Sequence, residues 1–120
     1  MREAGVPTAQ WEAFDRPEPA LEAAKARLER DGGVVIKADG EAAGKGVFVC
    51  STEDEAREAL TAIMVDRVFG SSGDRVLVEE RLEGEEASVM VLATGEKILL
   101  MPPVQDHKRA YDGDQGPKTG

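Results

Sequence analysis

The sequence predicts an α+β fold in which a mostly antiparallel sheet packs against two helices. Several short runs have the composition of strands, and two segments carry apolar side chains at the 3.6-residue spacing of amphipathic helices. In chain order the expected elements are β-α-β-β-α-β-β-β. A chain of 120 residues is long enough for one small domain or for part of a larger one.

A short strand over residues 10–14 precedes the first expected helix. Asp15 is expected to cap this helix, because Pro17 suits a first helical turn and an acidic residue follows three positions after the cap. Lys25 and Glu29 have the i,i+4 spacing of a helical ion pair. A glycine pair at 32–33 then ends the helix.

Two β-branched runs, residues 34–37 and 47–50, are expected to pair as strands around a glycine-rich loop. Thr52 and Glu55 have the spacing of a capping box and open the second helix. The apolar stripe of that helix consists of Ala56, Ala59, Leu60, Ile63, Met64 and Val68.

Three more strands are expected, over residues 75–79, 87–93 and 97–101. The sequence Thr94-Gly95-Glu96 suits a tight hairpin between the last two. Residues 105–120 are charged and rich in helix and strand breakers, so they are expected to form a loop that buries nothing of its own.

Composition excludes several classes of protein. With 24 acidic and 15 basic residues the net charge is −9, which argues against non-specific nucleic-acid binding, since phosphate contact depends on Lys and Arg. No apolar run approaches the roughly 20 residues of a membrane span, and Met1–Gly5 lacks the order of a signal peptide. A single cysteine, Cys50, cannot form an internal disulfide, so we expect a cytoplasmic protein.

The loop from Lys37 to Gly46 is the first candidate for chemistry. It resembles a phosphate-binding Walker loop but fails that template, because only three residues separate Gly40 from Gly44 and Gly46 stands where Ser or Thr would bind magnesium. Small residues still let backbone N–H groups approach an anion closely. The segment is therefore either a flap over nucleotide phosphates or a hairpin with solvated lysines.

Two further segments are candidates. The strand end at residues 76–82 has exposed backbone that suits a purine edge, and Glu86, four residues beyond Leu82, suits a ribose; the alternative is an acidic strand end facing water. Residues 105–120 are polar and follow a strand, as substrate-binding loops do, or they form a disordered tail. His107 is the only histidine, which argues against a His-based metal site.

Together these segments resemble the central part of the phosphoribosylamine–glycine ligases, a family of the ATP-grasp superfamily. The similarity rests on "AGVPTAQWEAF", "VVIKADGEAAGKGVFV", "VLVEERLEGEEASVMV" and "MPPVQDHKRAYDGDQGPKTG", and it covers nearly the whole chain. It implies an ATP-grasp nucleotide-binding segment over residues 1–104, comprising the flap and adenine hinge. Residues 105–120 would then face phosphate and substrate in a second, truncated subdomain.

The resemblance also implies roles for individual residues. The ATP-binding set is Lys37, Gly44, Lys45, Gly46, Glu79, Glu80, Leu82 and Glu86, with Arg81 inside the hinge. The substrate-facing set is Asp106, His107, Asp114, Gly116, Pro117 and Thr119. Lys108 and Arg109 are the catalytic candidates, since they would neutralise charge on the transferred phosphoryl group.

The implied reaction joins glycine to 5-phosphoribosylamine through a glycyl phosphate, giving glycinamide ribonucleotide, ADP and phosphate in purine biosynthesis. ATP and Mg²⁺ or Mn²⁺ would be required, with the metal ligands on a part of the parent chain beyond Gly120. We therefore expect these 120 residues to be inactive alone and to need the remainder of that chain. No nucleic-acid or membrane partner is expected.

Two positions depart from the family pattern: Lys118 replaces an asparagine of the substrate loop, and Glu41 stands where the family often has leucine. Two alternatives remain at this point. One is another ATP-grasp carboxylate–amine ligase, and the other is a non-catalytic acidic binding domain.

Overall fold

The computed structural model describes residues 4–105, 109–111 and 115–118. The chain divides into two compact units, Met1–Leu82 and Glu83–Gly120, and each is described by itself. This structural boundary differs from the division between residues 104 and 105 that the resemblance implies. That division separates nucleotide-binding from substrate-facing residues, and it remains a prediction.

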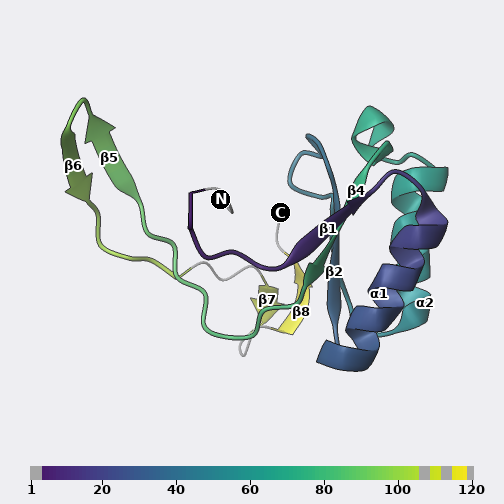
Figure 1. Ribbon diagram of the computed structural model, residues 1–120. Helices are drawn as coiled ribbons and strands as arrows, with labels where there is room; N and C mark the ends of the chain where they lie inside the picture. The colour runs from purple at the N-terminus through teal and green to yellow at the C-terminus, as the bar shows by residue number, and fades with distance from the viewer. Residues whose placement is uncertain (1–3, 106–108, 112–114, 119–120) are drawn as a thin grey trace. The chain divides into compact units, whose positions relative to one another are not determined.

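The first unit is a four-stranded antiparallel sheet with two helices on one face (Figure 1). Its strands are β1 (Trp11–Phe14), β2 (Val34–Ala38), β3 (Val47–Cys50) and β4 (Val76–Glu80), in the spatial order β1-β4-β2-β3. The helices are α1 (Pro17–Asp31) and α2 (Glu53–Leu60). The expected α+β architecture is confirmed.

The core lies between the sheet and the helices. Every second strand residue points to the helices, and four alanines let the helix backbones approach the sheet closely. The buried residues are Ala20, Ala24, Val34, Ile36, Cys50, Ala56, Ala59, Leu60, Ile63, Val76 and Val78.

The start of α1 differs from the expectation. Arg16, not Asp15, occupies the N-cap, and it makes no side-chain capping bond. The reason is Pro17 at the first helical position, which restricts the preceding residue to an extended backbone and so fixes the boundary at Arg16. The end is as expected, because Gly32 adopts a left-handed φ of 71° and donates its N–H to Leu28 O over 3.0 Å.

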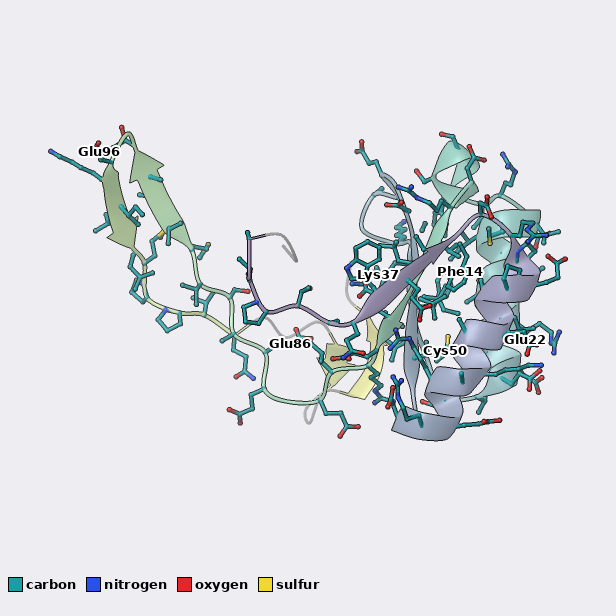
Figure 2. All side chains as sticks on the ribbon, in the orientation of Figure 1. Phe14, Glu22, Lys37, Cys50, Glu86 and Glu96 are labelled. Carbon is teal, nitrogen blue, oxygen red and sulfur yellow. The ribbon has the colours of Figure 1, made fainter. Side chains whose placement is uncertain are left out.

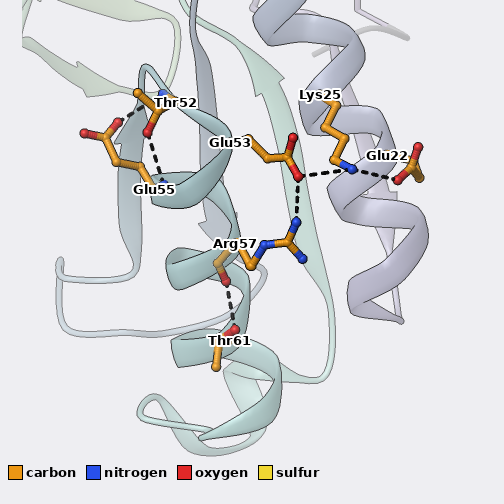
Figure 3. Close-up of polar contacts among 7 residues, drawn as sticks. All are labelled: Glu22, Lys25, Thr52, Glu53, Glu55, Arg57 and Thr61. Carbon is orange, nitrogen blue, oxygen red and sulfur yellow. Dashed lines mark hydrogen bonds and ion pairs between the residues drawn. The ribbon is translucent and has the colours of Figure 1, made fainter.

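The capping box of α2 is confirmed (Figure 3). Glu55 N donates to Thr52 Oγ1 over 3.3 Å, and Thr52 N donates to Glu55 Oε2 over 3.2 Å. The expected Lys25–Glu29 pair is wrong. Lys25 Nζ instead lies 3.1 Å from Glu53 of α2 and 3.3 Å from Glu22, and Glu53 is the main reason that the pKa of Lys25 is raised. Tertiary packing brings Glu53 within reach, which sequence spacing does not reveal.

The second helix does not continue regularly to Val68. After Leu60 the chain forms a π-helical turn, η1 (Thr61–Val65), and later a 3₁₀ turn, η2 (Gly70–Gly73). A π turn holds more residues than an α turn, so it rotates the apolar stripe out of phase. Ile63 is still buried, but Val68 is 58% exposed, which corrects its assignment to the stripe.

The second unit contains two antiparallel strand pairs. β5 (Val91–Thr94) and β6 (Lys97–Leu100) form the expected tight hairpin. β5 is shorter than the predicted strand over residues 87–93, because residues 87–90 form only an isolated bridge, between Ser88 and Val104. β7 (Arg109–Tyr111) pairs with β8 (Gln115–Lys118).

The expectation that residues 105–120 form only a loop is therefore wrong. The signal was the dipeptide Asp112-Gly113, which favours hairpins and separates the two runs that pair. In the part of the chain that the structure describes, no helix has the length and apolar character needed to cross a bilayer.

Candidate functional site

The candidate site is the sheet face opposite the helices. Side chains on this face alternate with the buried ones, and the strand register aligns them in two rows across the sheet. The rows are Trp11–Glu79–Val35–Val49 and Ala13–Leu77–Lys37–Val47. Figure 2 shows Lys37 on this side of the sheet, whereas Phe14 and Cys50 lie on the side of α1.

An ion pair stands at the centre of this face. Lys37 Nζ lies 2.5 Å from Glu79 Oε2, on the neighbouring strand, and the two side chains are 37% and 12% exposed. An ammonium group carries three N–H donors, so Glu79 leaves donors of Lys37 available to a ligand. The arrangement is an ion pair whose ammonium group is held in a fixed place and keeps N–H donors for a ligand, among side chains that are largely apolar.

The loop after Lys37 folds back beside it. We define the flap as residues 39–46; its ends are joined where Ala38 N donates to Gly46 O over 2.8 Å. At its tip Ala43 and Gly44 have φ angles of 49° and 74°, and Lys45 N donates to Ala42 O over 2.9 Å. Consecutive left-handed residues make a tight turn that exposes Gly44 and Lys45 to solvent.

The segment after β4 supplies exposed backbone. Glu80 still belongs to the sheet, since its N–H donates to Gln10 O over 2.9 Å, and strand alternation directs its side chain to the helix side. Arg81 and Leu82 lie beyond the strand and are exposed, and Arg81 Nη1 donates to Ser51 Oγ over 3.2 Å. Backbone groups of Arg81 and Leu82, beyond the strand, can therefore offer a donor and an acceptor to a planar ring.

The structure thus brings part of the predicted set into one unit. The ATP-binding candidates Lys37, Gly44, Lys45, Gly46, Glu79, Glu80 and Leu82 all belong to the first unit, and the exposed Glu86 belongs to the second. Asp106, His107, Lys108, Asp114 and Thr119 lie outside the described residues. Arg109 lies in β7, and Gly116 and Pro117 in β8.

Sequence reasoning missed Trp11 as part of this face. It pairs in register with Glu79, which places an aromatic side chain in the same row. The available signal was the alternation within residues 10–14, where Trp11 and Ala13 must share the face opposite Glu12 and Phe14.

Metal ligation is a different matter. Across residues 4–105, 109–111 and 115–118, no group of three or more His, Cys, Asp or Glu side chains comes together in a way that could hold a metal ion. The described donor set therefore does not fit a divalent cation.

Comparison with known proteins supplies the family. The family model described as "Phosphoribosylglycinamide synthetase, ATP-grasp (A) domain" matches residues 1–120. The chain belongs to this family. It is 51% identical over 117 residues to a phosphoribosylamine–glycine ligase of Streptococcus pneumoniae serotype 4. The matched region covers 97% of this chain and 27% of that protein.

Solved structures agree on the fold. The crystal structure of phosphoribosylamine–glycine ligase from Thermotoga maritima matches 99% of this chain and 30% of its own, with a TM-score of 0.80 and 32% identity. D-alanyl-alanine synthetase A from Vibrio cholerae matches 85% of this chain and 29% of its own with a TM-score of 0.66, and at 21% identity it shares the fold alone. The family is an ATP-grasp family, which in general uses ATP and a divalent metal ion. The chain spans less than a third of these relatives.

Proposed function

We propose that this chain is the nucleotide-binding part of a ligase that joins glycine to 5-phosphoribosylamine. The reaction consumes ATP, passes through a glycyl phosphate, and gives glycinamide ribonucleotide, ADP and phosphate in purine biosynthesis. The proposal is supported by the family membership and by relatives that carry the name phosphoribosylamine–glycine ligase.

The observation that carries the nucleotide part is Lys37 on the open face of the sheet. Glu79 holds its ammonium group 2.5 Å away on the adjacent strand, so the charge does not have to be ordered when an anion arrives. The flap begins at the end of the same strand, and its tip exposes Gly44 and Lys45. Phosphate oxygens placed between them would accept from both, because both present N–H donors.

The remaining roles follow the family assignment. Backbone groups of Glu79–Leu82 would form hydrogen bonds with the adenine ring, and the carboxylate of Glu86 would accept hydrogen bonds from the ribose hydroxyls. Lys108 and Arg109 would stabilise charge on the transferred phosphoryl group. The substrates would contact the set Asp106, His107, Asp114, Gly116, Pro117 and Thr119, and Lys118, next to the last of these, stands where the family pattern has asparagine.

The metal ion of the proposed reaction would be Mg²⁺ or Mn²⁺. Its ligands would lie on the rest of the longer ligase chain, as the resemblance to the family implies. We therefore expect the 120-residue chain to bind nucleotide but to release no ADP by itself. Its single cysteine, Cys50, is consistent with a reducing, cytoplasmic setting.

Isothermal titration with ATP tests the nucleotide proposal. Lys37→Ala removes a charge-assisted hydrogen bond, so we expect the affinity for ATP to fall about 10- to 100-fold. Lys25→Ala is the matched control, since Lys25 lies in α1 on the other side of the sheet and pairs with Glu22 and Glu53. Equal ATP affinity in the wild type and Lys37→Ala would contradict the proposed site.

A further inference from the structure

The base of the flap is held by a segment more than 30 residues further along the chain. Ser72 Oγ donates to Glu41 O over 2.7 Å, and Asp39 N donates to Arg75 O over 2.9 Å. The Arg75 guanidinium also donates to the Asp39 carboxylate. Three separate contacts therefore join residues 39–41 to residues 72–75.

Gly40 lies against Ser72 so closely that no side chain fits between them. A Cβ on Gly40 would lie 2.6 Å from Ser72 Oγ and 3.0 Å from Ser72 Cα. The φ angle of Gly40 is not positive, so alanine could adopt the same backbone conformation. The need for glycine at this position thus comes from the contact with Ser72.

The segment that carries Ser72 is itself anchored in the core. Gly73 is buried, and a Cβ there would clash with the carbonyl oxygen of Ile63 in the π turn. Phe69 packs against Phe48 of β3 with ring centroids 6.3 Å apart, and β4 begins at Val76. Ser72 therefore belongs to the rigid part of the first unit.

The tip of the flap has no such support. Gly44 and Lys45 are exposed, and a Cβ built on Gly44 would meet nothing within 4 Å. Because the base of the loop is fixed, the exposed tip can move, but only within a short distance of the base.

We propose that Ser72 is a positioning residue for the flap. Together with Gly40 it forms a latch that fixes residues 39–41, so that the exposed tip at Gly44 and Lys45 is held ready over the phosphates of a bound nucleotide. This inference rests on the proposed nucleotide binding. Pre-ordering the base lowers the entropy that the flap loses when phosphate binds.

The first test compares Ser72→Ala with Ser71→Ala, a control in the same 3₁₀ turn, by titration with ATP and with adenosine. Loss of the hydroxyl should weaken ATP binding about two- to tenfold, and adenosine binding should not change, because adenosine has no phosphates for the flap to contact. Ser71→Ala should match the wild type in both titrations. Equal weakening of ATP and adenosine in Ser72→Ala, or no weakening of either, would overturn the proposal.

The second test uses the packing of Gly40 on Ser72. Gly40→Ala should weaken ATP binding in the wild-type background, but much less in a Ser72→Gly background, where the crowding side chain is gone. Effects that simply add would show that the two residues do not act through one contact.

The third test separates the latch from the proposed function. Amide hydrogen exchange of residues 41–46, measured without nucleotide, should be faster in Ser72→Ala than in the wild type and in Ser71→Ala. Unchanged exchange would overturn the latch. A wild-type chain that does not bind ATP would refute nucleotide binding instead, while faster exchange in Ser72→Ala would still support the latch.

Discussion

The two units of the chain differ in where their hydrophobic side chains lie. All buried hydrophobic residues among the described positions belong to the first unit, between the sheet and its helices. Residues 83–105 of the second unit are all exposed, and they include the large side chains Val89, Met90, Val91, Leu92, Ile98, Leu99, Leu100, Met101 and Val104. The first unit therefore contains its own hydrophobic core, whereas residues 83–105 bury no side chains within their own unit.

The strand sequences of the two units differ as well. β2 and β4 carry one apolar face toward the helices and place Lys37 and Glu79 on the other. Residues 91–93 and 98–100 are apolar at successive positions, so both faces of the hairpin are apolar. A strand with one polar face can carry a binding site. Strands apolar on both faces are typical of buried strands, so the sequence of this hairpin does not account for its exposure.

The largest effect should come from matched isoleucine substitutions in the two units. Ile36→Ala removes a fully buried side chain and should lower the free energy of unfolding by about 2–5 kcal/mol. Ile98 is 72% exposed, so Ile98→Ala should change it by less than about 0.5 kcal/mol. Urea unfolding followed by far-UV circular dichroism measures both, and equal losses would contradict the contrast between the units.

A pH effect should come next, and it belongs to the first unit alone. Burial raises the pKa of the Cys50 thiol to about 11, with a smaller contribution from the Glu55 carboxylate. A raised thiol pKa stabilises the folded state fully below the unfolded pKa of about 9, and this stabilisation is lost as the pH rises toward 11.

Urea unfolding at pH 7 and pH 10 measures the effect. The loss between the two pH values should be larger by about 1 kcal/mol in the wild type than in Cys50→Ala, which has no thiol to titrate. Parallel pH profiles of the two proteins would show that Cys50 is not buried as described.

A smaller effect should follow the loss of the α2 cap. Thr52→Ala removes the hydroxyl that accepts from Glu55 N, so the free energy of unfolding should fall by about 1 kcal/mol. Thr52→Ser keeps an acceptor and should retain most of the stability. If both variants behave alike in thermal unfolding, the methyl group of Thr52 and not its hydroxyl is what matters.

Features set by neighbouring residues were predictable from the sequence. The Thr52–Glu55 capping box, the turn before Lys97 and the alternation of β2 each depend on spacings of a few residues. Features set by tertiary contact were not. Lys25 pairs with Glu53 across two helices, and Ser72 reaches Glu41 across 31 residues of sequence.

The candidate site divides in the same way. Local motifs predict Lys37, the flap and Glu79 as site residues, and all three lie in the first unit, while their roles stay predictions. The π turn that buries Ile63 and exposes Val68 left no local signal, because an α-helix and a π turn share the same apolar residues and differ only in phase. The latch at Gly40 was equally hidden, since its partner Ser72 is unrelated in sequence.

The central claim is that nucleotide binds on the open face of the first unit, and an NMR titration tests it most directly. With ¹⁵N-labelled protein and increasing ATP, amide shifts should change at Lys37, Gly44–Gly46, Glu79–Leu82 and Glu86, while the amides of α1 stay unchanged. Lys37→Ala should greatly weaken this response. Shifts concentrated on α1 and α2, or no saturable shifts with ATP, would contradict the account.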